Sequence, residues 1–198
     1  MIKIIVNGIE LDLEEREIIL PGHGPVLIKA LTKDVAENVV DPILNSMKRS
    51  QHQEQISSHM IDQLRQWFDG NDAYFFIVGE DPENNTLLGI TSGYVSPFHG
   101  EIYGSGKLIL NTSGVRGIGE KLLKIRADTY FSSEKINVLY DIPLDKSENS
   151  KVKRIFEKFG YDQESRGEFY RMMELKMFPH RPYTLSRENY KKAISKLI

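Results

Sequence analysis

The stretch from Leu108 to Leu123 constrains the fold most, because it contains a strand, a glycine-rich turn and a helix in direct succession. Its apolar start, Leu-Ile-Leu, is typical of a buried strand, and the apolar spacing from Ile118 is typical of an amphipathic helix. A helix N-terminus presents unpaired N–H groups and the positive end of a dipole, and glycines allow an anion to approach closely. The stretch therefore predicts a phosphate or pyrophosphate site.

Two common phosphate motifs do not fit this turn. A P-loop requires a lysine after its last glycine, whereas Gly119 is followed by Glu120. A dinucleotide-binding turn should follow the first strand, whereas this turn comes after a run of expected antiparallel strands. The motif also needs an acidic residue at the end of the next strand, and Asp141 is only a weak candidate for it. A tight turn that binds nothing remains an alternative at this point.

Composition excludes several classes of protein. The chain has 198 residues and a net charge of -2, and this charge gives no argument for binding to nucleic acid or to an anionic membrane. It has no cysteine, which excludes disulfides and thiolate sites. No apolar run approaches the roughly 20 residues needed to span a bilayer. His52 and His59 lack a carboxylate that would complete a metal site. We therefore expect no metal and a cytoplasmic location.

The N-terminal segment predicts a small appendage. Asn7-Gly8 between two apolar segments indicates a two-residue hairpin, and the Pro- and Gly-rich residues 21–25 interrupt the chain. We interpret residues 1–25 as a hairpin and linker that covers an edge or a helix.

The remaining chain predicts one α/β domain over residues 26–177 and a helical tail over 178–198, which Ser186 can cap. The expected elements are a strand at 26–31, helices at 33–49 and 55–68, strands at 73–79, 86–95 and 101–111, a helix from the glycine turn to 131, a strand at 136–140, a helix at 149–159, and strands at 161–165 and 168–176. Short turns join the three middle strands into an antiparallel meander, and the next connection has the length of a parallel crossover. The expected fold class is α+β.

A second motif narrows the ligand. From Asn149 a helix ends in Phe156-Glu157-Lys158-Phe159-Gly160-Tyr161, which resembles the closing motif of the GNAT acyltransferase superfamily. The glycine turn resembles the other motif of that superfamily, with Gly117 and Gly119 on its two glycines. The order of the elements is also similar over about residues 26–176.

This resemblance implies that the protein binds acetyl-coenzyme A. The pyrophosphate would bind at the helix N-terminus, and the pantetheine arm would pair with the preceding strand. A backbone N–H near Leu110 would polarise the thioester. The chemistry would therefore occur at 109–111, where the strands separate. The expected cofactor-binding residues are Leu108, Ile109, Leu110, Gly114, Val115, Arg116, Gly117, Ile118, Gly119, Glu120, Asn149 and Phe156. Asn149 can also be a plain helix cap.

The sequence departs from the pattern at two positions. Gly114 stands where the motif has Arg or Gln, and Phe156 stands where a tyrosine often protonates the leaving thiolate. Tyr140, Tyr161 or water are the alternatives for this proton. Glu101, acting through water, is the first candidate for the base that deprotonates the amine, followed by His99, Tyr103 and Glu80.

The expected activity is direct transfer of an acetyl group to a primary amine of a small molecule or peptide, without a covalent enzyme intermediate. A coenzyme A-binding or regulatory domain with little transfer is the alternative, and a structural module is a third possibility. A homodimer is possible, and the sequence does not identify the acceptor.

Overall fold

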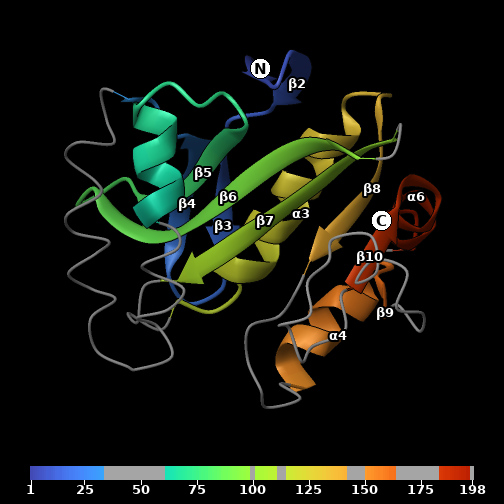
Figure 1. The fold of residues 1–198 in the computed structure, drawn as a ribbon. Coiled ribbons are helices and arrows are strands. Elements are labelled where there is room, and N and C mark those ends of the chain that lie inside the picture. Colours follow the sequence, from blue (N-terminus) through green and yellow to red (C-terminus); the bar gives the residue numbers. More distant parts are fainter. Residues whose placement is uncertain (34–60, 99–100, 111–114, 142–149, 164–182, 197–198) are drawn as a thin grey trace.

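The computed structural model describes residues 1–33, 61–98, 101–110, 115–141, 150–163 and 183–196 (Figure 1). The strands are β1 (Ile2–Val6), β2 (Ile9–Leu13), β3 (Arg16–Leu20), β4 (Gly24–Ala30), β5 (Tyr74–Asp81), β6 (Thr86–Phe98), β7 (Glu101–Leu110), β8 (Ile136–Asp141), β9 (Asp162–Gln163) and β10 (Tyr183–Ser186). The helices are α3 (Ile118–Phe131), α4 (Ser150–Lys158) and α6 (Arg187–Ile194), and residues 61–68 are also helical. No helix within these ranges is long and apolar enough to cross a membrane.

Eight of the described strands form one sheet in the order β3-β4-β5-β6-β7-β8-β10-β9. Its paired neighbours run antiparallel except for β7 and β8, which run parallel because the helical crossover α3 joins them. The predicted meander of β5, β6 and β7 is present, and the mostly antiparallel α+β sheet confirms the expected fold class.

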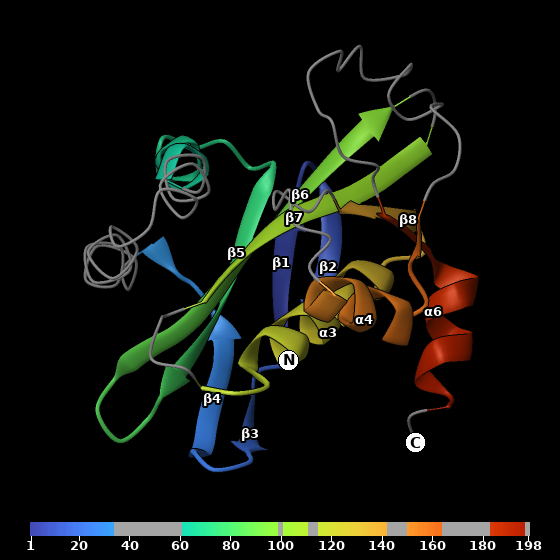
Figure 2. The same cartoon turned by 90° about the horizontal axis from the view of Figure 1, so that it is seen from below.

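Two apolar layers cover the sheet, because side chains alternate between its faces. On β5, Phe75 and Ile77 belong to the core that contains α3, whereas Phe76 and Val78 pack with Leu64 of the helical residues 61–68. Figure 2 shows α3 and α4 on one side of the sheet and the helical residues 61–68 on the other. The face on the α3 side carries the larger core.

The N-terminal hairpin covers α3, as the sequence predicts. Asn7 and Gly8 both have positive φ, at 47° and 69°, which is the backbone geometry of a type I′ turn. Leu11 and Leu13 are fully buried in the core shared with α3. The interpretation of the following residues as a linker is wrong, because Arg16–Leu20 forms β3 and pairs with β4 at the edge of the main sheet.

The C-terminal segment is part of the sheet rather than only a helical tail. β10 lies between β8 and β9, in antiparallel pairing with both, and this strand was not predicted. Of the two final strands expected from the sequence, the described part is β9, and the rest falls outside the described residues. Ser186 caps α6 as predicted, since its side chain accepts the N–H of Asn189.

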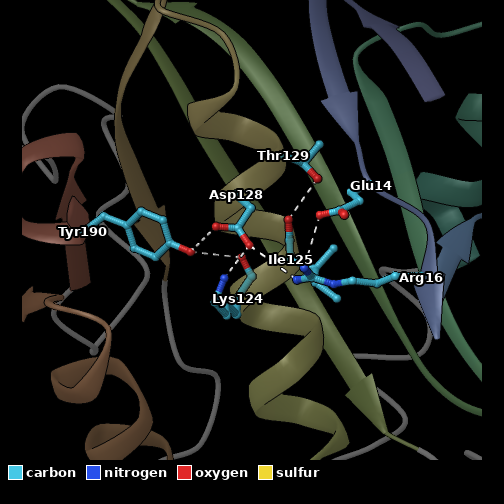
Figure 3. Close-up of polar contacts among 7 residues, drawn as sticks. All are labelled: Glu14, Arg16, Lys124, Ile125, Asp128, Thr129 and Tyr190. Atoms are coloured by element: carbon cyan, nitrogen blue, oxygen red, sulfur yellow. Dashed lines mark hydrogen bonds and ion pairs between the residues drawn. The ribbon is translucent and has the colours of Figure 1, made fainter. Parts of the chain in front are cut away.

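Both ends of the chain meet on the outer face of α3. Figure 3 shows Asp128 accepting the hydroxyl of Tyr190 from α6, 2.5 Å from Oδ1, and the Lys124 ammonium, 2.7 Å from Oδ2. Arg16 of β3 lies 3.7 Å from the same carboxylate. Asp128 therefore joins the N-terminal and C-terminal segments to one helix.

Arg187 fixes the start of α6 to the turn after α3. Its guanidinium donates to the carbonyl oxygens of Phe131 at 2.5 Å, Ile136 at 2.7 Å and Ser133. We expect Arg187→Met to lower the free energy of unfolding by about 2–3 kcal/mol, because three carbonyl groups lose a charged donor. Urea denaturation measures this change. Lys191→Met removes the same charge from an exposed position on α6 and should change stability by less than about 0.5 kcal/mol; equal effects of the two variants would contradict the assignment.

Candidate functional site

Strands β7 and β8 separate halfway along β7. Their parallel pairing runs from Ile102 with Ile136 to Ser105 with Tyr140, and no described residue pairs with 106–110 on this side. β6 continues to pair with β7 as far as Leu110. The two arrows start side by side in Figure 1 and point away from each other. Among the described residues, 106–110 therefore form a strand edge that is open toward β8.

The tyrosine hydroxyl of Tyr130 shows which backbone groups face this open edge. It accepts the N–H of Tyr94 at 2.7 Å and donates to the carbonyl of Ser105, so the Ser105 carbonyl points toward β6. Successive peptide groups of a strand point in opposite directions. The N–H groups of Gly106, Leu108 and Leu110 consequently face the open edge, whereas that of Ile109 faces β6. The separation starts at Gly106, earlier than the predicted 109–111.

The N-terminus of α3 follows the open strand in sequence. Gly117 is its N-cap, with φ of 94° and no side-chain cap bond, and Ile118 and Gly119 are buried behind it. Only glycine adopts this backbone conformation without strain, so the residue type here is set by geometry. Within the described part of the chain, no side chain caps the backbone N–H groups of the first turn.

The charges around this helix end are nearly balanced. Glu120 lies in the first turn of α3, and its carboxylate accepts the ammonium of Lys158, the last residue of α4. Arg116 is exposed next to the N-cap, and Val115 packs partly buried against the core. Lys158 therefore cancels the carboxylate that would otherwise repel an anion at this helix end.

Several predicted site residues cannot be placed. Gly114, Asn149 and His99 lie outside the described residues. Glu101 is described as the first residue of β7, where its backbone pairs with Phe98. Their proposed roles stay predictions.

The structure places Phe156 and Tyr140 on opposite faces of the sheet. Phe156 is buried on the α3 side, with its ring centroid 4.6 Å from that of Tyr161 and 4.9 Å from that of Tyr183. Tyr140 faces the other way, because its neighbour Leu139 points into the α3 core, and its ring meets that of Tyr103 edge-on at 5.5 Å. Burial raises the pKa of Tyr103 above its ordinary value.

Glu80 lies away from the separation of β7 and β8. Its carboxylate is 2.5 Å from the ammonium of Lys29, on the side of β5 that pairs with β4. Because β6 lies between β5 and β7, we no longer consider Glu80 a candidate for the base at the open edge. Within the described ranges, no group of three or more His, Cys, Asp or Glu side chains is arranged to hold a metal.

A buried polar network beside the separation was not predicted from the sequence. Arg126 of α3 binds Asp141, the last residue of β8, and Tyr161 donates to the same carboxylate. An arginine on the apolar face of a helix, in line with Leu122 and Tyr130, was the available signal. Burial and the charge of Asp141 raise the pKa of Tyr161 well above its ordinary value, so this phenol stays protonated.

Comparison with solved structures identifies the fold. The chain is similar to an uncharacterized protein from Bacillus halodurans, with 16% identity, a TM-score of 0.61 and coverage of 93% of this chain and 96% of that one. It is also similar to a nucleotide-linked sugar GNAT (12% identity, TM-score 0.58, coverage 94% and 96%) and to an aminoglycoside acetyltransferase in complex with coenzyme A (13% identity, TM-score 0.57, coverage 84% and 98%). The chain has the GNAT fold. No protein-family model and no curated protein sequence matches it.

In this GNAT fold, Gly106 is the residue at the start of the open edge. A Cβ atom on Gly106 would lie 2.0 Å from the Ser92 carbonyl oxygen and 2.8 Å from Arg126 Nη1. We expect Gly106→Ala to lower the free energy of unfolding by at least about 2 kcal/mol, because the backbone oxygen cannot move freely away. Chemical denaturation tests this, with Ser105→Ala as the control; a Gly106→Ala protein as stable as the control would show that the close approach is not real.

Proposed function

We propose that this protein transfers an acetyl group from acetyl-coenzyme A directly to a primary amine. The observation that carries the proposal is the open edge of β7, which leads into the uncapped N-terminus of α3. An extended, amide-containing arm fits the edge, and a pyrophosphate fits the helix end. A ligand that has both parts is coenzyme A, and the aminoglycoside acetyltransferase of similar fold was solved with it.

The open edge supplies hydrogen-bonding groups at the right spacing for such an arm. The N–H groups of Leu108 and Leu110 would pair with the pantetheine amides, as neighbouring strands do. The N–H of Gly106, at the point where β8 still borders β7, would then face the thioester carbonyl. This assignment moves the polarising donor from Leu110, as predicted from sequence, to Gly106.

The helix end supplies the phosphate contacts. The backbone N–H groups at Ile118, Gly119 and Glu120 belong to the first turn of α3 and would bind the pyrophosphate. Arg116 would add a charged contact from its exposed position, and Asn149 would bind the pantetheine arm.

The transfer requires no covalent enzyme intermediate. The amine nitrogen attacks the thioester carbonyl carbon, and the negative charge collects on the oxygen that faces the donor. The C–S bond then breaks and its electron pair goes to sulfur, while the amine loses a proton. The products are an amide and the coenzyme A thiolate, which becomes the free thiol when it takes up a proton.

Two proton transfers accompany this step. Glu101 or His99 would take the amine proton. The departing sulfur would take up a proton from water or from Tyr140, which lies on the face of the sheet opposite Phe156, on the side from which an acceptor can approach. The acceptor is a small molecule or peptide amine; the aminoglycoside acetyltransferase of similar fold has a small-molecule acceptor by name.

Binding can be tested without knowledge of the acceptor. At about 100 times its dissociation constant, acetyl-coenzyme A should stabilise the chain by about 2.7 kcal/mol in a thermal shift assay. Gly117→Val should lose this stabilisation, because a valine at this positive φ displaces the N–H groups of the first turn.

Gly22→Val is the matched control, since Gly22 also has positive φ, at 75°, and open space around it in the turn between β3 and β4. Both variants are strained, but the control should keep the ligand-induced stabilisation. If millimolar acetyl-coenzyme A stabilises neither the wild type nor the control, the proposed function is wrong.

Transfer can be separated from binding by measuring thiol release with a panel of primary amines. We expect amine-dependent release from the wild type and none from Gly117→Val. Binding without release with any amine would favour a coenzyme A-binding or regulatory domain, the alternative that Phe156 motivates.

A further inference from the structure

Three buried polar side chains meet where β7 and β8 separate. Arg126, Asp141 and Tyr161 have exposed fractions of only 1%, 3% and 4%. They come from the middle of α3, the last position of β8 and the segment after α4. No sequence motif connects them, and only the fold brings them together.

Their contacts are short and directional. Arg126 Nη2 lies 2.5 Å from Asp141 Oδ1, and the hydroxyl of Tyr161 donates to Oδ2 at 2.5 Å. Arg126 Nη1 donates to the hydroxyl of Thr91 on β6 at 3.3 Å. The carboxylate is thus shared between a cation and a phenol, while the cation extends beneath the sheet toward β6.

Burying this network is costly, and stability alone does not explain it. A buried ion pair is often no more stabilising than apolar side chains of similar volume. Moreover, Nε of Arg126 is buried and has no hydrogen-bond partner among the described residues. A guanidinium that is incompletely satisfied in the core points to a role for its charge.

The charge lies next to the open edge. A Cβ atom on Gly106 would come within 2.8 Å of Arg126 Nη1, so the absence of a side chain at this position lets the guanidinium lie directly under the strand. Gly106 is also the first residue whose N–H faces the open edge. The positive end of the network therefore lies beneath the backbone group that would face a thioester.

On this face of the sheet, neither Phe156 nor Tyr161 offers a proton to sulfur. Phe156 has no proton to donate, and the nearby Tyr161 hydroxyl is already donated to Asp141. A departing thiolate can instead be stabilised by a fixed positive charge in a site of low dielectric constant.

We propose that Arg126, held by Asp141 and Tyr161, is a positioning residue of the transfer. Its buried charge acts through the Gly106 backbone and stabilises the negative charge that develops on the thioester oxygen and on the departing sulfur. This inference rests on the proposed function, because it takes the reacting thioester to lie beside Gly106.

The decisive variant removes the charges without leaving unpaired groups. In Arg126→Met/Asp141→Leu/Tyr161→Phe, apolar side chains replace all three members of the network. We expect a folded protein with a dissociation constant for coenzyme A within about threefold of wild type but with kcat lower by at least about tenfold. An unchanged kcat, or a loss of coenzyme A affinity equal to the loss of kcat, would overturn the inference.

A second measurement requires binding only. The thiolate absorbance of bound coenzyme A, followed against pH, reports the charge near sulfur. A nearby cation should raise the ratio of thiolate to thiol in the wild type by at least about tenfold over free coenzyme A at the same pH, and the triple variant should lose this effect.

This measurement separates the two hypotheses. Wild-type protein that binds coenzyme A with an unshifted thiol overturns the inference alone. Absence of amine-dependent transfer with a shifted thiol overturns the proposed transferase activity and the role of Arg126 in it, and leaves only the effect of its charge on the bound sulfur. If the wild type does not bind coenzyme A, both fail.

A matched pair of single variants covers the case in which the triple variant does not fold. Tyr161→Phe and Tyr190→Phe each remove a phenol that donates to an aspartate at 2.5 Å, and Figure 3 shows the second of these contacts on the outer face of α3, remote from the open edge. Only Tyr161→Phe should lower kcat, by about threefold or more, because Asp141 then offsets more of the Arg126 charge. Equal kcat values for the two variants would overturn the inference.

Discussion

The parallel crossover from β7 through α3 to β8 is the constraint on which the rest of the structure depends. A crossover of this kind places the helix across one face of the sheet and returns the chain beside the strand that it left. Ile118, Leu122 and Tyr130 of α3 bury against that face, and Gly104 leaves room for the ring of Tyr130. Within the described residues β8 pairs with only the first half of β7, so the second half is an edge open on that side, and the N-terminus of α3 follows it in sequence.

The position of this edge was not predictable from the sequence, although the resemblance to the GNAT superfamily implied that the strands separate. The apolar strand, the glycines and the helical spacing are local signals, and they place β7 and α3 within a few residues of the observed bounds. Where β8 stops pairing with β7 depends on contacts between residues distant in sequence. Arg126 and Tyr161 bind the last residue of β8 from two other elements, and no periodicity in the sequence encodes that pairing.

The wrong interpretations have a similar physical origin. Residues 21–25 contain proline and glycine, which mark a linker and a hairpin turn equally well, and pairing with β4 decides between them. β10 is only four residues long, too short to show an alternating pattern, and it forms because β8 and β9 each leave an edge for it to pair with. By contrast, Asn7-Gly8 and Ser186 were interpreted correctly because turn and cap preferences depend on local backbone geometry.

The remaining puzzle of the sequence, a glutamate in the first turn of the helix proposed to bind an anion, has an answer in the fold. Glu120 would weaken a phosphate site by repulsion, but α4 ends at Lys158 beside it, and the two charges cancel. Both side chains are partly exposed, so the pair contributes little to stability. Its effect is local, because it neutralises the charge of Glu120. The potential at this helix end is then positive, since it is set by the N–H groups at Ile118 and Gly119 and by the exposed Arg116. The two resembling motifs, which are separate in sequence, therefore meet at this helix end, where the second contributes the lysine that pairs with the glutamate following the glycines of the first.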